Sequence, residues 1–110
     1  MPTPGDVILV DFPGVQGVKT RPGVVVSSDL YHATRPDVTV GLCTTQLGSA
    51  TGPTDYLLVD WAAAGLHVPT AFRCFFNSQP ASRVRRLIGR LSDRDWAEVQ
   101  ARLRLALAFA

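Results

Sequence analysis

The sequence predicts a mainly β domain, a small and strongly bent β-barrel followed by one C-terminal helix. Short apolar and β-branched segments follow one another through most of the chain, separated by loops rich in glycine and proline. Only the last segment has the spacing of an amphipathic helix. At 110 residues the chain is long enough for one hydrophobic core and too short for two, so residues 1–110 are expected to form a single domain.

The expected strands are short and lie between breaker-rich loops. They cover residues 6–12, 24–28, 37–46, 55–60 and 70–76, with 83–91 as a sixth candidate. Residues 13–23 hold three glycines and two prolines, which predicts a loop in place of a helix or a central strand. A second loop of small residues covers 47–54, and residues 61–66 predict one helical turn that ends at Gly65.

The C-terminal helix has a clear start. Ser92 is the expected N-cap, and aspartates at positions 93 and 95 fall in the first turn, where the helix dipole favours negative charge. Leu91 and Trp96 have the spacing of a hydrophobic staple. One apolar face is predicted to pack on the sheet; its members are Trp96, Val99, Leu103 and Leu107.

Composition excludes several classes of protein. The apolar content is too high for a disordered chain, and no apolar run reaches the roughly 18 to 20 residues that a membrane-spanning helix needs. The N-terminus lacks a signal-peptide pattern, and Cys43 and Cys74 are expected to be buried free thiols. These features predict a cytoplasmic protein with no membrane partner. The net charge of +2 is too small to indicate nucleic-acid binding by itself.

Few patterns in the chain indicate catalysis. No serine-histidine-aspartate signature, phosphate-binding loop or metal-ligand spacing is present, so no metal and no cofactor are predicted. His32 and His67 are expected to be solvated loop residues, and Asp93 and Asp95 are explained by capping. A basic cluster is either a solvated strand face or a phosphate-contacting stripe; it contains Arg83, Arg85, Arg86 and Arg90.

Arg21 stands out by its position. It precedes Pro22-Gly23 at the mouth of the β-branched run Val24–Val26, behind the predicted loop. It is either a surface charge at a strand start or a cation that the fold holds in place for a purpose. The residue pattern alone does not separate these two interpretations.

The order of the segments resembles a known family. The chain runs through "GDVILVDFPGVQGVKTRPGVVVSSDLYH", "VTVGLCTTQ", "GPTDYLLVD", "WAAAGL" and "IGRLS" before the closing helix. This order resembles the MazF/PemK family of toxin-antitoxin ribonucleases over essentially the whole chain. The likeness is strongest in residues 5–29 and weakest between residues 70 and 80.

The resemblance implies a fold, a function and partners. The fold is an SH3-like β-barrel with a C-terminal helix, in a homodimer. Members of the family are metal-independent endoribonucleases that cut single-stranded RNA at short motifs, and an antitoxin peptide covers the RNA groove. DNA is contacted only through the antitoxin complex. The family's reactive arginine matches Arg21, and its reactive threonine matches Thr44, with Thr45 as the neighbouring alternative.

These residue types suit RNA cleavage through the 2′-OH. A guanidinium stabilises the charge that develops on the phosphorane, and a threonine hydroxyl can orient the 2′-OH or the phosphate. Neither is a good base at neutral pH, so a slow or strongly geometry-dependent enzyme is expected. The expected RNA-binding residues are Phe12, Gln16, Lys19, Thr45, Gln46, Asp55 and Tyr56. Asp55 would repel phosphates unless it reads a base or pairs with Lys19.

Departures from the family pattern keep other functions open. Residues 74–76 are apolar and only Arg73 is charged nearby, while Asp55 stands where some relatives carry a histidine. These changes allow a weakened nuclease or an altered cleavage specificity. The alternatives are a CcdB-like barrel that targets gyrase by protein binding, and a non-catalytic family member that only binds a partner.

Overall fold

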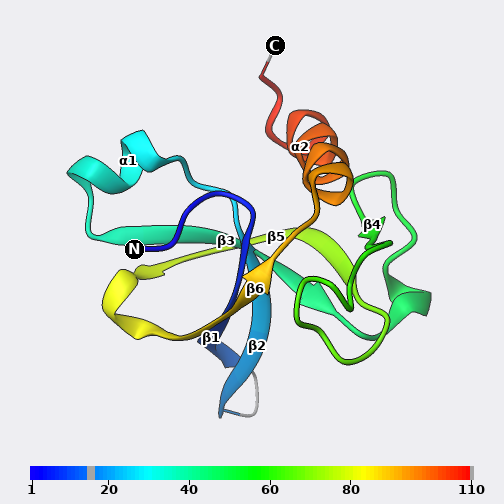
Figure 1. Cartoon of the computed structure of the whole chain (residues 1–110), viewed down its shortest axis with the longest axis horizontal. Helices are drawn as coiled ribbons and strands as arrows, with labels where there is room; N and C mark the ends of the chain where they lie inside the picture. Colours follow the sequence, from blue (N-terminus) through cyan, green and yellow to red (C-terminus); the bar gives the residue numbers. More distant parts are fainter. Residues whose placement is uncertain (15–16, 110) are drawn as a thin grey trace.

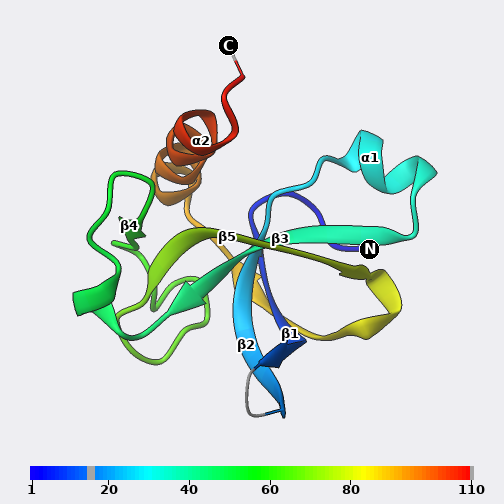
Figure 2. The same cartoon turned by 180° about the vertical axis from the view of Figure 1, so that it is seen from behind.

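A single antiparallel sheet and one long helix make up most of the molecule (Figure 1). The structure is a computed structural model that describes residues 1–14 and 17–109. Its described residues form a six-stranded sheet in the order β4-β5-β3-β2-β1-β6. The sheet bends strongly and the C-terminal helix lies across one end of it, as both views show (Figure 2). The prediction of a small barrel-like β fold with a C-terminal helix is therefore confirmed.

The elements follow one another with short connections. The strands are β1 (Asp6–Gly14), β2 (Gly17–Val25), β3 (Asp37–Thr44), β4 (Tyr56–Leu57), β5 (Ala71–Pro80) and β6 (Val84–Arg90). The helices are α1 (Asp29–Thr34) and α2 (Asp93–Leu107), with two single 3₁₀ turns at Leu47–Ser49 and Ala81–Arg83. No helix in the described part of the chain is long and apolar enough to cross a membrane.

The prediction of a loop over residues 13–23 is mostly wrong, because β1 extends to Gly14 and β2 begins at Gly17. β1 and β2 form a long hairpin in which Val10 pairs with Arg21 and Phe12 pairs with Lys19. Pro22 is tolerated within β2 because β3 pairs with β2 only from Gly23 to Val25, which leaves one edge of β2 open at the proline. Arg21 therefore stands inside a strand, not in front of one.

The segment around β4 also differs from the prediction. The strand expected over 55–60 shortens to two residues, because backbone N–H groups after β4 bond to a side chain of α2 instead of a neighbouring strand. The prediction of one helical turn over residues 61–66 is confirmed, since the Ala64 amide donates to the Asp60 carbonyl at 3.2 Å and the Leu66 amide donates to the Trp61 carbonyl at 3.1 Å. Gly65 ends the turn with φ of +89°, which glycine adopts without strain.

Two further elements depart from expectation. β5 continues to Pro80, four residues past the expected end at residue 76, because it pairs with β3 along its whole length. The short helix α1 follows Ser28, whose hydroxyl accepts a bond from the Tyr31 amide at 3.1 Å. Six residues are too few for a helical period to show in the sequence.

Both faces of the bent sheet are buried. Val7 and Val24 belong to one cluster with Phe72, beneath α2, while Ile8 and Val25 belong to another on the opposite face. Successive strand residues point to opposite faces, so the apolar run at the end of β2 fills both clusters. This double burial explains why the strands appear in the sequence as continuous apolar runs.

A buried carboxylate joins α2 to the segment after β4. Ser92 caps the helix as predicted, since its hydroxyl accepts from the Asp95 amide at 3.3 Å. The Asp95 carboxylate is fully buried and accepts from the Tyr56 hydroxyl at 2.7 Å. It also accepts from the amides of Val59 and Asp60, at 3.1 and 2.8 Å. Asp95 therefore fixes the tertiary structure in addition to favouring the helix start.

Candidate functional site

Arg21 and Thr44 come together across neighbouring strands. Gly23 of β2 pairs with Leu42 of β3 at the end of their ladder, and Arg21 and Thr44 each lie two residues beyond that pair on their own strands. Both residues line a cavity of about 200 Å³, called here the phosphate cavity. Its lining consists of Arg21, Leu42, Cys43, Thr44, Arg73 and Phe75. The two residues expected to be catalytic thus share one site, although their roles in catalysis stay a prediction.

The Thr44 hydroxyl is held in a defined orientation. Thr44 is buried at the end of β3, with 9% of the residue exposed, and its hydroxyl oxygen accepts from the Gln46 amide at 3.1 Å. Because the hydroxyl oxygen is used as an acceptor there, its hydrogen can be donated toward the cavity. This geometry makes Thr44 a hydrogen-bond donor to an anionic group.

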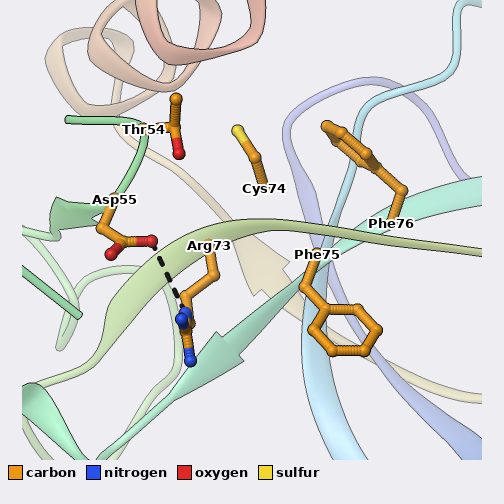
Figure 3. Close-up of a pocket in the computed structure, with 6 residues that line it drawn as sticks. All are labelled: Thr54, Asp55, Arg73, Cys74, Phe75 and Phe76. Atoms are coloured by element: carbon orange, nitrogen blue, oxygen red, sulfur yellow. Dashed lines mark ion pairs between the residues drawn. The ribbon is translucent and has the colours of Figure 1, made fainter. Parts of the chain in front are cut away.

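Arg73 brings a second guanidinium to the same cavity from β5. Between the pairs Gly41–Phe76 and Cys43–Phe72, β5 runs through three residues while β3 runs through one, which marks a bulge. Bulges re-aim side chains and are common next to functional sites. Figure 3 shows Arg73 and Phe75 on one side of β5, with Cys74 and Phe76 on the other.

Asp55 pairs with Arg73. The Arg73 Nε lies 3.5 Å from the Asp55 carboxylate, and the other carboxylate oxygen accepts from the Gly52 amide at 3.0 Å. Of the two alternatives offered for Asp55, pairing with Lys19 is replaced by the pair with Arg73, since β4 lies against β5 and the β1–β2 hairpin lies beyond β3 in the sheet. The prediction that Asp55 reads a base is not tested by this pairing.

A second, larger cavity adjoins the first. It measures about 450 Å³, is called here the base cavity, and is lined by Thr54, Asp55, Arg73, Cys74, Phe75 and Phe76 (Figure 3). Arg73 and Phe75 line both cavities, so the two are neighbours along β5. Together they make a groove that runs from Arg21 to Asp55.

The other residues expected to bind RNA lie in different surroundings. Lys19, Thr45 and Gln46 are exposed. Tyr56 lines neither cavity: its hydroxyl donates to Asp95, and the Arg102 guanidinium lies 4.9 Å from the centre of its ring. The burial and the Asp95 carboxylate raise the pKa of this tyrosine well above its usual value.

Phe12 lies in β1, within the hairpin that β1 forms with β2. The backbone of Phe12 pairs with that of Lys19 in the hairpin. Gln16 lies outside the described residues.

The cysteines provide no nucleophile. Both are free, as predicted, but only Cys43 is buried, whereas Cys74 is half-buried. Burial raises the pKa of the Cys43 thiol to about 12. The pKa of Cys74 is also raised, first by burial and then by the Asp55 charge. Thiols of this kind stay protonated and unreactive near neutral pH. Among the described residues, no three histidine, cysteine, aspartate or glutamate side chains gather where they could hold a metal ion.

The prediction of a solvated His32 is wrong, whereas His67 is exposed as expected. His32 is buried because α1 folds back beside β3. Its Nε2 lies 2.5 Å from the Ser27 hydroxyl, whose oxygen also accepts from the Thr39 amide at 2.9 Å. This arrangement anchors α1 to the sheet, away from the phosphate cavity.

The arginine cluster of β6 behaves largely as a strand face. Arg85 pairs with Asp11 at 3.0 Å and Arg90 pairs with Asp6 at 3.1 Å, both across the β1–β6 ladder. β6 is the edge strand next to β1, while the phosphate cavity lies on β2, β3 and β5. The solvated-face interpretation is therefore the one that these contacts favour.

Sequence reasoning named Arg73 only as a leftover charge. The available signal was an arginine within the otherwise apolar run of residues 71–76. A charged side chain inside such a run is costly to bury, so its presence indicates that this part of the strand borders a surface. The bulge that directs it into the cavity has no signature in the sequence.

The bent sheet, its C-terminal helix and a cavity lined by two arginines and a threonine define a class of small barrel-like protein with an arginine-lined groove. A family model of PemK-like, MazF-like toxins of type II toxin-antitoxin systems matches residues 3–107. The chain belongs to this family. Comparison with curated protein sequences gives no significant match.

Solved structures of toxins share the fold. An endoribonuclease in complex with its cognate antitoxin, from a mycobacterial species, is 18% identical, with a TM-score of 0.81 over 100% of this chain and 98% of that one. The Mycobacterium tuberculosis toxin MazF-mt6 is 19% identical, with a TM-score of 0.78 over 96% and 98% of the two chains. MazF in the MazE-MazF complex of Deinococcus radiodurans is 18% identical, with a TM-score of 0.77 over 99% and 98%.

Proposed function

We propose that this toxin is a metal-independent endoribonuclease that cleaves single-stranded RNA in the phosphate cavity. The observation that carries the proposal is the convergence of Arg21, Thr44 and Arg73 on one cavity from three different strands. The family supports the same reaction, and a comparable structure is described as an endoribonuclease.

The reaction is an internal transesterification. The 2′-oxygen attacks the adjacent phosphorus, the bond from phosphorus to the 5′-oxygen breaks, and the 2′-OH loses a proton while the leaving 5′-oxygen gains one. The products are a 2′,3′-cyclic phosphate and a 5′-OH. Negative charge rises on the non-bridging oxygens in the transition state, which is where hydrogen-bond donors lower the barrier most.

Each residue of the cavity has a role in this scheme. Arg21 and Arg73 donate to the non-bridging oxygens, and two guanidiniums can hold both oxygens at once. Thr44 donates its hydroxyl hydrogen to the phosphate or the attacking group while the Gln46 amide fixes its oxygen. Neither a carboxylate nor an imidazole is among the described lining residues, so catalysis depends on charge stabilisation and geometry more than on a strong base.

The same proposal includes the partners. A cognate antitoxin peptide covers the groove and blocks RNA, DNA is contacted only through that complex, and the toxin acts as a homodimer in the cytoplasm. Two of the similar structures are toxins together with an antitoxin, which supports the antitoxin part.

The test is cleavage of a long single-stranded RNA by the purified protein in EDTA. Wild-type protein should give discrete cuts that end in cyclic phosphate, and the folded variants Arg21→Ala and Arg73→Ala should lose most of the rate. Arg85→Ala is the matched control, since Arg85 is an exposed arginine already paired with Asp11 on another strand pair. Equal cutting by all four proteins would indicate a contaminant or a different active site, and no cutting by the wild type would favour the partner-binding barrel.

A further inference from the structure

A carboxylate lies deep in a groove that is otherwise built for anions. The Asp55 side chain is only 11% exposed and lines the base cavity beside Arg73. Such a charge weakens phosphate binding, so its place in the groove needs another explanation. Groups with hydrogen-bond donors and no negative charge are the natural ligands of a buried carboxylate.

The base cavity has the size and position for a nucleotide base. Its 450 Å³ fall within the range of about 300–1,000 Å³ typical of small-molecule sites. It shares Arg73 and Phe75 with the phosphate cavity, so a base next to the scissile phosphate can reach it without a break in the RNA backbone. Figure 3 shows Arg73 between Asp55 and Phe75.

Phe75 supplies a stacking surface. Its ring is 61% exposed, on the same side of β5 as Arg73. A large aromatic ring left open beside a guanidinium is the arrangement on which unpaired bases stack. The neighbouring Phe76 turns the other way and packs against the core, so the exposure of Phe75 is specific to this groove face.

We propose that the base cavity binds one unpaired guanine beside the cleaved phosphate, with Asp55 reading its Watson–Crick edge and Phe75 stacking on its ring. The inference rests on the proposed ribonuclease function and adds a specificity-determining residue to it. Asp55 holds the Gly52 amide with one oxygen and faces Arg73 with the other, which leaves acceptor sites on both.

Guanine fits this carboxylate better than the other bases. Its N1–H and N2–H₂ groups are parallel donors that match two carboxylate oxygens. Adenine and cytosine each have one donor group beside a ring acceptor on this edge, and uracil has one donor between two carbonyl acceptors. None of them presents two adjacent donors, so each would place an acceptor against one of the carboxylate oxygens. The site therefore selects against these bases as well as for guanine.

Binding of short, uncleavable oligonucleotides tests the subsite separately from catalysis. The probes are fluorescein-labelled 2′-deoxy-2′-fluoro octamers of uracil, with a guanine or an adenine moved through each position, and the dissociation constant is measured by anisotropy. One guanine position should bind about tenfold more tightly than adenine at the same position. Asp55→Asn should remove this preference, and Asp93→Asn, an exposed aspartate on α2, should retain it.

The stacking part has its own variant. Phe75→Ala should weaken every octamer by about tenfold or more, because stacking does not depend on the base. If instead Phe75→Ala changes the molecular mass in light scattering and leaves binding unchanged, a second copy of the chain covers the ring and the proposal is wrong. The proposal also fails if Asp55→Asn keeps the guanine preference, or if no octamer binds.

The two hypotheses can fail independently. RNA cleavage without any guanine preference would leave the nuclease standing and remove the subsite. Guanine-selective binding without cleavage would establish the subsite and remove the nuclease.

Discussion

Arg21, Thr44 and Arg73 meet because three strands present alternate residues to one face. Thr44 is buried and its oxygen accepts from the Gln46 amide, so its hydrogen points away from that amide and can be donated to the phosphate. The arginines bring charge, and the threonine brings a neutral donor with a fixed direction. At this scale the account depends on hydrogen bonds that are strongest when charge builds up on the phosphorane.

Removal of the Thr44 hydroxyl tests that donor. Thr44→Val keeps the shape and β-branching but has no hydroxyl, and we expect the single-turnover cleavage rate to fall by about 10²-fold. Thr44→Ser keeps the hydroxyl and should retain most of the rate. A valine variant as fast as the wild type would show that the hydroxyl takes no part in the reaction.

Asp95 is a residue-scale test of stability. Asp95→Ala leaves two backbone amides and the Tyr56 hydroxyl without their acceptor, and should lower the free energy of unfolding by about 3 kcal/mol. Asp93→Ala, at an exposed site in the same helical turn, should cost less than about 1 kcal/mol. Urea denaturation of both variants gives the comparison; similar losses would contradict the structural role of Asp95.

Arg21 and Thr44 could be singled out from the sequence because they stand beside a resemblance that covers the whole chain. Arg73 could not, because its direction depends on a bulge in β5. His32 was misjudged for a related reason: a lone histidine gives no sign of its burial, which here depends on the fold of α1.

At the scale of the elements, the turn at residues 61–65 and β6 lie in direct backbone contact. A Cβ at Gly89 would lie 2.2 Å from the carbonyl oxygen of Ala64, and one at Gly65 would lie 2.6 Å from that of Ile88. These glycines permit the turn to lie flat on the strand. The same turn is tied to α2 by Asp60 and Asp95, so helix, turn and edge strand form one unit.

Gly89→Ala tests this contact. The opposing atom is backbone and cannot swing aside, so we expect a loss of about 3 kcal/mol in the free energy of unfolding. Gly48→Ala is the matched control, since no heavy atom lies within 4 Å of a Cβ there. Thermal unfolding of the two variants should separate them clearly, and an unaffected Gly89→Ala would mean that the turn lies further from β6.

The Asp60–Arg94 pair predicts a dependence of stability on acid. Two bonds from Arg94 and one from Ser92 lower the pKa of Asp60 from 3.8 to about 2. Because the pKa of Asp60 is lowered on folding, the ionised carboxylate stabilises the folded state. This contribution to the free energy of unfolding is complete above about pH 4 and is lost as the pH falls through about 2.

The matched variant is Arg94→Ala, in which the pKa of Asp60 returns toward its usual value. The midpoint of thermal unfolding should therefore fall less steeply between about pH 4 and about pH 2 in this variant than in the wild type. Parallel curves for the two proteins would show that the pair does not contribute.

Element prediction succeeded where the pattern was long and failed where contacts override it. α2 was predictable from its cap and from the packed side chains Trp96, Val99 and Leu103, whereas Leu107, expected on the same face, is 49% exposed. The β1–β2 hairpin was not, because prolines and glycines that usually mark a loop are accommodated where β2 has an open edge. β4 is shorter than its apolar segment because Asp95 takes the next two amides.

At the scale of the whole molecule, the net charge is small and the arginines are unevenly distributed over the surface. The net charge is +2, and Arg85 and Arg90 are paired with aspartates at one edge of the sheet. The groove between Arg21 and Arg73 lies on β2, β3 and β5, away from that edge. RNA affinity is therefore expected to come from few contacts, unlike that of a strongly basic nucleic-acid-binding protein.

The salt dependence of RNA binding measures the number of contacts between arginines and RNA phosphates. Two arginine–phosphate contacts predict a slope of roughly −1.4 for the logarithm of the association constant against that of the salt concentration, at about 0.7 per phosphate. Arg21→Ala should reduce the slope, whereas Arg85→Ala should leave it unchanged because Arg85 lies on β6 and does not line the phosphate cavity. A slope reduced equally by Arg85→Ala would place the β6 arginines on the RNA.

The measurement that tests the account most directly is single-turnover cleavage in EDTA of one preferred RNA and of the same RNA with a 2′-deoxy sugar at the cut. We predict that the all-RNA strand is cleaved to a 2′,3′-cyclic phosphate and a 5′-OH, and that the single 2′-deoxy substitution abolishes that cut. Cleavage of the 2′-deoxy strand at the same position would contradict attack by the 2′-oxygen, and with it the mechanism assigned to Arg21, Thr44 and Arg73.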